Sequence, residues 1–208
     1  DFNLYRKDRT IALGGGVLCY IHHSINVQIF EPTVDANNID DHYSSSFEVL
    51  WLILRPRVLP RPYSQLLVVV VYCPPWFEAA RKIALSKYLS GGLDFLVRRY
   101  PSAGIVLLGD FNTFDTTFLI RHHDLKQLVK IPTRGNRILD KVFTNCYKLY
   151  DEALVVAPLG KSDHMSVILK APGSKRPPVG RKAVTKIVFN AESYRLIDNE
   201  LNAINWSV

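Results

Sequence analysis

The chain has 208 residues, 48% of them hydrophobic, and this size and composition suit one domain with a substantial core. A net charge of +7 favours an anionic partner, with nucleic acid as the first candidate. No apolar run approaches the roughly 20 residues that cross a membrane, which excludes a membrane-spanning helix, and no signal peptide is visible. The cysteines Cys19, Cys73 and Cys146 lack metal-ligand spacing, which favours reduced thiols in a nuclear or cytoplasmic protein that is not secreted.

The amino-terminal third of the chain is expected to hold one hairpin and two further strands. Residues 1 to 13 are polar, and because the chain opens on Asp1 rather than Met, we expect a missing upstream segment. The stretch "GGGVLCYI" predicts a strand, "NVQIFE" its hairpin partner, and residues 33 to 46 a polar loop. "FEVLWLILRP" and "SQLLVVVVYC" then predict two strands whose continuous apolar character implies burial on both faces.

Helices and strands alternate through the rest of the domain. An imperfect apolar stripe predicts a helix over residues 76 to 99, interrupted at Gly91-Gly92, before the strand "GIVLLGDFN". Residues 115 to 129 predict a second, short helix. Three more strands are expected in "RILDKVFTN", in "DEALVVAP" and at the end of "SDHMSVILK", and we expect the last of them, 164 to 169, to lie in the core. This pattern favours an α/β domain of two sheets flanked by helices over residues 1 to 171.

The composition changes after Ala171. The stretch "PGSKRPPVGRKAVTK" is rich in proline, glycine and basic residues, so residues 172 to 190 predict a basic linker. Residues 191 to 208 then predict the start of a following helical segment.

Several apolar strands end in polar side chains, and functional residues collect where the strands of such sheets end. The residues concerned are Tyr72, Asp110, Asn112, Asp140, Asp163 and His164. Each has an ordinary structural explanation by itself, because Asp and Asn suit turns and a Tyr can pack in the core. Together they supply carboxylates for Mg²⁺, a histidine with a carboxylate to orient it, and neutral donors for a phosphate. The set favours metal-assisted phosphodiester hydrolysis.

At these residues the sequence resembles the endonuclease/exonuclease/phosphatase superfamily, which includes DNase I-like nucleases and apurinic endonucleases. The stretches "GGGVLCYI", "VVVYCPP", "IVLLGDFN", "RILDKVFTN" and "LGKSDHMSV" carry the resemblance, in the family's order. The branch that it resembles most is the endonuclease domain of non-LTR retrotransposon polyproteins. The resemblance implies a DNase I-like α/β sandwich and a DNA endonuclease that depends on Mg²⁺, with Mn²⁺ as an alternative ion.

The resemblance also implies a role for each residue of the proposed catalytic group. Asp110 is similar to the family's carboxylate that positions or activates the attacking water. Asn112 resembles the amide that hydrogen-bonds the scissile phosphate, and Tyr72 the active-site tyrosine near it. His164 resembles the histidine that contacts the phosphate, with Asp140 as the carboxylate that orients it.

Further residues are implied at the metal and at the DNA, with one departure from the family. Asp163 resembles a metal-site carboxylate, and Arg134, Lys161 and Ser162 are expected at the DNA, although a solvated basic surface explains the two cations equally well. The family's first two strands, which carry an Asn and then a metal-binding Glu, match nothing here. Glu48 in "FEVLW" follows the glycine-rich strand and is out of order, so we expect a structural role for it. The first strands are therefore expected to be missing, and the 208-residue chain to be inactive by itself.

Two other functions stay open. One is a phosphatase of the same superfamily, acting on inositol phosphates or lipids, or an RNA-directed nuclease. The other is a non-catalytic remnant that only binds nucleic acid. The stretches "PTRG" and "LDKVFTN" and the basic tail favour the retroelement interpretation, which adds a downstream reverse transcriptase as a possible partner. His122 and His123 are interpreted as surface histidines rather than ligands.

Overall fold

The computed structural model describes residues 1–9, 15–32, 46–172, 195 and 199. The chain divides into two units, Asp1–Gly173 and Ser174–Val208, and the fold below is that of the first. The basic linker expected over 172–190 and the helical segment expected over 191–208 lie outside the described residues, apart from residues 172, 195 and 199. The polar loop expected over 33–46 also lies outside them, apart from Ser46.

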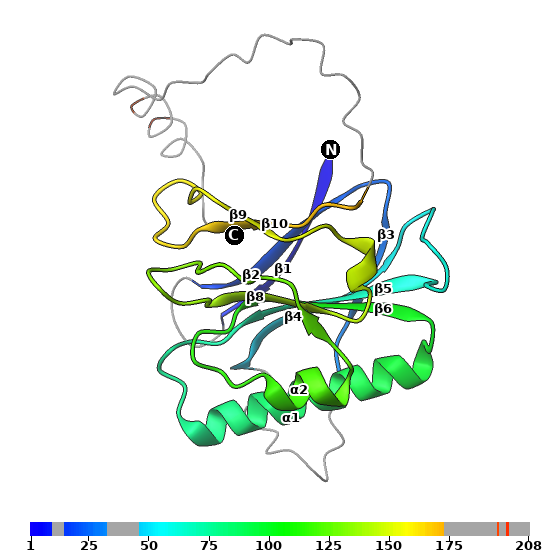
Figure 1. Ribbon diagram of the computed structural model, residues 1–208, viewed down its shortest axis with the longest axis horizontal. Coiled ribbons are helices and arrows are strands. Elements are labelled where there is room, and N and C mark those ends of the chain that lie inside the picture. Colours follow the sequence, from blue (N-terminus) through cyan, green and yellow to red (C-terminus); the bar gives the residue numbers. More distant parts are fainter. Residues whose placement is uncertain (10–14, 33–45, 173–194, 196–198, 200–208) are drawn as a thin grey trace. The chain divides into compact units, whose positions relative to one another are not determined.

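A mixed six-stranded sheet forms the middle of the domain (Figure 1). Its order is β3 (Asn26–Phe30), β4 (Glu48–Arg55), β5 (Gln65–Tyr72), β6 (Ala103–Asp110), β8 (Asp140–Thr144) and β7 (Lys126–Gln127). Strands β5 and β6 are parallel, and all other neighbours are antiparallel. The continuous apolar sequences of β4, β5 and β6 follow from this position, because both faces of the sheet are covered.

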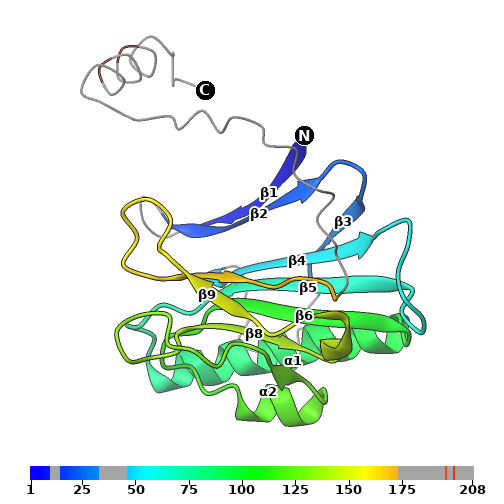
Figure 2. The ribbon, with the colours of Figure 1, turned by 45° about the horizontal axis from the view of Figure 1, so that its top comes forward.

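The two faces of this sheet are covered by different elements (Figures 1 and 2). Helices α1 (Ala79–Arg99) and α2 (Thr117–His122) pack on one face. The other face is covered by two small antiparallel sheets, β1 (Phe2–Asp8) with β2 (Gly16–His22) and β9 (Leu154–Val156) with β10 (Ser166–Ile168). The predicted α/β sandwich is confirmed, with the described helices gathered on one side of the six-stranded sheet.

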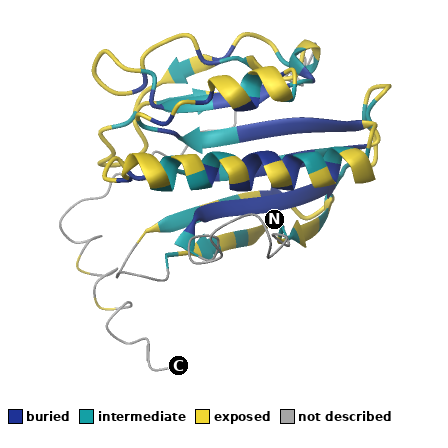
Figure 3. Cartoon of the chain, turned by 90° about the horizontal axis from the view of Figure 1, so that it is seen from below, coloured by how far each residue is buried: buried dark blue, intermediate teal, exposed yellow. Residues whose placement is uncertain are grey.

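Helix α1 runs without a break, so the predicted interruption at Gly91-Gly92 is wrong. Its buried stripe includes Leu85, Leu89, Leu93 and Leu96, which alternate with exposed positions (Figure 3). A Cβ at Gly92 would lie 2.6 Å from Cη2 of Trp51 on β4, so glycine lets the helix approach the sheet closely. None of the helices in the described ranges is long and apolar enough to span a membrane.

Two predicted pairings and one helix boundary are also wrong. Strand β3 is not the hairpin partner of β2, because β2 pairs along its whole length with β1, and β3 pairs with β4 instead. The helix expected over 115–129 ends at His122, since Asp124 adopts φ 49° and the chain then enters the sheet as β7. Strand β10 is shorter than residues 164–169 and lies half-exposed in the sheet with β9 rather than in the core.

Candidate active site

Four polar side chains form a row across the six-stranded sheet, at one end of its strands. Glu48 pairs with Tyr72, Tyr72 with Asp110, and Asp110 with Asp140, so the row crosses β4, β5, β6 and β8. Side chains directly opposite one another on neighbouring strands lie about 4.5–5.5 Å apart at Cβ. The row belongs to the face opposite the helices, because the alternate residue Phe111 packs in the helix-side core.

Asp140 and His164 meet in this row. The Asp140 carboxylate accepts a hydrogen bond from Nδ1 of His164 at 2.7 Å, and both side chains are largely shielded from solvent. The expected contact between these two residues is therefore present, and Asp140 is half-buried. Since Nδ1 is held by the carboxylate, Nε2 is the ring nitrogen left to contact a substrate group.

Thr133 supports both members of this pair. Its fully buried Oγ1 accepts hydrogen bonds from the backbone N–H groups of Leu139 and Asp140, each at 3.1 Å. Its carbonyl accepts a hydrogen bond of 2.7 Å from the N–H of Met165, the residue after His164. Thr133 lies in the "PTRG" stretch and was not among the site residues predicted from the sequence.

Asp110 is the last residue of β6, and its neighbours in the chain fix its position in the row. Gly109 has φ 141°, and a Cβ there would lie 1.8 Å from the carbonyl oxygen of Val71, so only glycine allows this approach of β5 and β6. The N–H of Asn112 donates to Oδ1 of Asp110 at 2.9 Å, and its side-chain amide donates to the carbonyl of Cys73 at 3.0 Å. Asn112 itself adopts φ 44°, a left-handed conformation that Asn tolerates. The "GDFN" stretch thus locks the ends of β5 and β6 together.

The electrostatics at Asp110 suit a proton acceptor. Burial raises the pKa of its carboxyl above the ordinary value, and the neighbouring Asp140 carboxylate raises it further. The Asn112 N–H and the nearby His164 act in the opposite direction and limit the rise. A carboxylate with a raised pKa is a better general base than an ordinary surface aspartate.

Asp110, Asp140 and His164 offer ligand atoms that all lie within 4.8 Å of one another. A cavity of about 360 Å³ opens beside the two aspartates, with Met165 and Val167 of the covering segment among its lining residues. Two carboxylates in a solvent-accessible cavity fit a hard divalent cation such as Mg²⁺, which binds one or two carboxylates and keeps several waters. The residues present therefore fit a divalent metal ion.

Glu48 and Arg9 extend the row beyond Tyr72. Glu48, only 4% exposed, accepts hydrogen bonds from Nε of Arg9 at 2.8 Å and from the N–H of Gly16 at 2.6 Å. The Arg9 guanidinium lies 5.5 Å from the ring centre of Trp76 and 5.8 Å from that of Tyr72. Burial raises the pKa of Tyr72, which keeps its hydroxyl a donor at neutral pH. The signal for Glu48 was present in the sequence as one acid in an otherwise apolar strand.

The remaining predicted residues lie in the loop before β10 and beside it. Asp163, predicted as a metal ligand, is 68% exposed and forms an ion pair of 2.5 Å with Arg134, predicted at the DNA. Asp163 is outside the group formed by Asp110, Asp140 and His164. Ser162 accepts a hydrogen bond from the N–H of His164 at 3.1 Å, and Lys161 is exposed. The roles of these four residues in metal or DNA binding stay predictions.

This chain resembles known proteins in fold rather than in sequence. No protein-family model matches the sequence, and no curated protein matches it. Among solved structures, the fold is similar to the human Nocturnin catalytic domain, which was determined with a bound sulfate anion. The TM-score is 0.53, the match covers 81% of this chain and 70% of that chain, and sequence identity is 14%. At this identity the likeness shows the fold, which is the DNase I-like α/β sandwich.

Proposed function

We propose that the protein is a divalent-metal-dependent phosphodiesterase of the endonuclease/exonuclease/phosphatase superfamily and that it nicks DNA at the insertion site of a retroelement. The observation that carries the proposal is the meeting of Asp110, Asp140 and His164 at one edge of a DNase I-like sandwich. The sulfate anion of the Nocturnin structure gives further support, because sulfate has the shape and charge of a phosphoryl group. The nucleus, as the site of the DNA, and a downstream reverse transcriptase are parts of the same proposal.

In this function Asp110 receives the proton of the attacking water. Its position is set by the Asn112 N–H at 2.9 Å, and its raised pKa favours proton uptake. Mg²⁺ held by Asp140, through the carboxylate oxygen that does not contact His164, would neutralise charge on the phosphoryl oxygens and on the leaving group, and would leave Asp110 free as the base. Asp110 is the last residue of the core strand β6 and is paired on both sides within the sheet, so the base is held rigidly relative to the substrate.

His164 and Tyr72 act on the other side of the phosphate. The Asp140 carboxylate at 2.7 Å holds the His164 ring, so that Nε2 donates a hydrogen bond to the negative charge that develops on the phosphate. Tyr72 adds a neutral hydroxyl donor from the neighbouring strand, two places along the row from Asp140. Both donors come from a fixed sheet edge, and preorganised donors of this kind stabilise a transition state without further rearrangement.

The test is the conversion of supercoiled plasmid to the open-circular form with Mg²⁺ and with EDTA. The 208-residue chain should be compared with a longer form, extended at its amino terminus by two strands that carry an Asn and a metal-binding Glu as the superfamily has them. We expect nicking by the longer form with Mg²⁺ alone, and little or none by the shorter chain. His164→Ala in the longer form should lower the rate about 10²-fold, the effect of removing one transition-state donor.

A substrate panel separates this function from its alternatives. Cleavage of an inositol phosphate or a phospholipid, with plasmid left intact, would replace the endonuclease with a phosphatase. Plasmid binding without cleavage of any substrate by the longer form would favour a binding remnant. The matched control is Lys170→Ala, which changes an exposed basic residue outside the row and should leave the nicking rate unchanged.

A further inference from the structure

We propose that Asp94, His122 and His123 form a second metal site that binds a borderline transition-metal ion such as Zn²⁺ between α1 and α2. Asp94 lies on α1, His122 is the last residue of α2, and His123 is its C-cap. Their ligand atoms all lie within 4.8 Å of one another. The group comes from the helical side of the sheet, so it is separate from the row that carries Asp110.

The spacing of the three ligand atoms is close to that of a tetrahedral site. Oδ1 of Asp94 lies 3.0 Å from Nε2 of His122 and 4.0 Å from Nδ1 of His123. Bonds of about 2.0–2.1 Å from zinc to nitrogen and oxygen place tetrahedral ligands about 3.3 Å apart. The observed spacing therefore needs adjustments of about 1.5 Å or less, which side-chain rotation supplies. Two imidazoles and one carboxylate are a donor set that suits zinc better than magnesium.

His123 is the second and independent sign of a ligand. Its side chain is only 4% exposed, yet its Nε2 is buried without a hydrogen-bond partner. Its Nδ1, at 4.0 Å from the Asp94 carboxylate, is too far away for a hydrogen bond. Among the described residues, Nε2 of this ring has no partner and Nδ1 faces the Asp94 carboxylate without a hydrogen bond, which leaves Nδ1 open to a bound ion.

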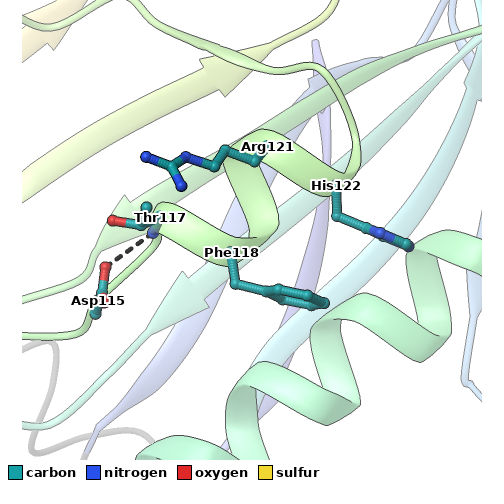
Figure 4. A pocket seen from close by; sticks show the side chains of 5 residues that line it. All are labelled: Asp115, Thr117, Phe118, Arg121 and His122. Carbon is teal, nitrogen blue, oxygen red and sulfur yellow. Dashed lines mark hydrogen bonds between the residues drawn. The ribbon is translucent and has the colours of Figure 1, made fainter.

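A simple ion pair with Asp94 explains the position of His122 but not that of His123. His122 stacks on Phe118, with ring centres 5.3 Å apart, and reaches Asp94 across the helix pair, as an ordinary surface contact would. Figure 4 shows Phe118 and His122 extending side by side from α2 toward the neighbouring helix, at the margin of a cavity of about 520 Å³. The buried ring of His123 packs edge-on against His122, with ring centres 4.7 Å apart, and does not hydrogen-bond Asp94. A metal ion would bind both histidines, and the open side would admit water as the fourth ligand.

The structural consequence is a cross-link between the two helices. Helix α2 has only six residues and is too short to be stable by itself. The segment that follows it leads into β7, the edge strand that pairs with Phe143 and Thr144 of β8. An ion at Asp94, His122 and His123 would fasten this segment to α1 without touching the catalytic group.

The experiment titrates Zn²⁺ into the full chain by calorimetry and follows Co²⁺ substitution by visible absorption, which reports tetrahedral coordination. Asp110→Asn serves as the background, because it weakens metal binding in the row. Asp94→Asn keeps the shape of its side chain and His122→Gln keeps a polar side chain of similar length, and each should weaken Zn²⁺ binding by at least about 10-fold. Zn²⁺ should also raise the thermal midpoint of the background protein by mass action, and this rise should disappear in both variants.

The chain contains its own matched control. His22 and His23 are also adjacent, with ring centres 4.4 Å apart, but no carboxylate joins them in a metal-capable group among the described residues. The double variant His22→Gln, His23→Gln should leave Zn²⁺ affinity unchanged. Equal Zn²⁺ affinity in the Asp94→Asn variant, or binding that is lost with the His22 and His23 pair, would overturn the site and leave an ion pair only.

Discussion

The two faces of the six-stranded sheet differ in what their side chains do, although the same strands supply both. Toward the helices, Leu107 of β6 and Phe111, the first residue after it, are completely buried in an apolar core. Toward the small sheets, the alternate positions of the same strand hold Leu108 and then Asp110. Because successive side chains of a strand point to opposite faces, one strand can serve the core and the site at once. Stability is therefore expected to depend mainly on one face and chemistry on the other.

The largest expected effect is on the chemical face. Asp110→Ala should lower the nicking rate of the longer form about 10²–10⁴-fold, because it removes the proton acceptor. DNA binding should change little, since it rests on basic contacts to phosphates. Plasmid nicking and a DNA-binding titration, run on the same preparation, measure the two effects. Retained cleavage in this variant would show that Asp110 is not part of the catalytic centre.

The helix-side face should respond in the opposite way. Leu107→Ala should lower the free energy of unfolding by about 2–5 kcal/mol, because it leaves a cavity in a completely buried site. Denaturant unfolding measures this loss, and the matched variant Leu108→Ala should cost less because Leu108 is only partly buried. Equal losses at the two positions would contradict the difference between the faces.

Thr133→Val should affect both properties by a smaller amount. The change keeps the shape of the side chain but leaves the N–H groups of Leu139 and Asp140 without their acceptor. We expect a loss of about 1–3 kcal/mol in unfolding free energy, the cost of buried donors without partners. The nicking rate should also fall, because Asp140 would no longer be held for His164. An unchanged rate together with reduced stability would limit Thr133 to a purely structural role.

The smallest expected effect is a gain in thermal stability when the charge of Asp110 is removed. Burial raises the pKa of Asp110 in the folded protein, so the ionised carboxylate destabilises the native state at neutral pH. Asp110→Asn should therefore raise the thermal midpoint slightly at pH 7 in metal-free buffer, while it abolishes nicking. The advantage should shrink as the pH falls through the raised pKa, because the wild-type carboxyl then becomes neutral as well. A midpoint below that of the wild type at pH 7 would contradict this account.

The sequence by itself determined the elements whose signals are local. Runs of apolar residues marked β4, β5 and β6, and the polar groups at their ends marked Tyr72 and Asp110. A strand that is buried on both faces needs a continuous apolar run, and such a run can be recognised without knowledge of the neighbouring strands. The same reasoning reached Asp140 and His164, because each stands beside an apolar stretch.

Only the tertiary structure decided which elements meet. Nothing local distinguishes β1 from β3 as the partner of β2, since both are short strands with mixed polarity. Thr133 contacts Asp140 from outside any strand, and Glu48 meets Arg9 across 39 residues of the chain. Asp94 and His122, 28 residues apart, come together only where α2 packs on α1. Such contacts depend on the packing of whole elements, which is a property of the complete fold rather than of any short stretch.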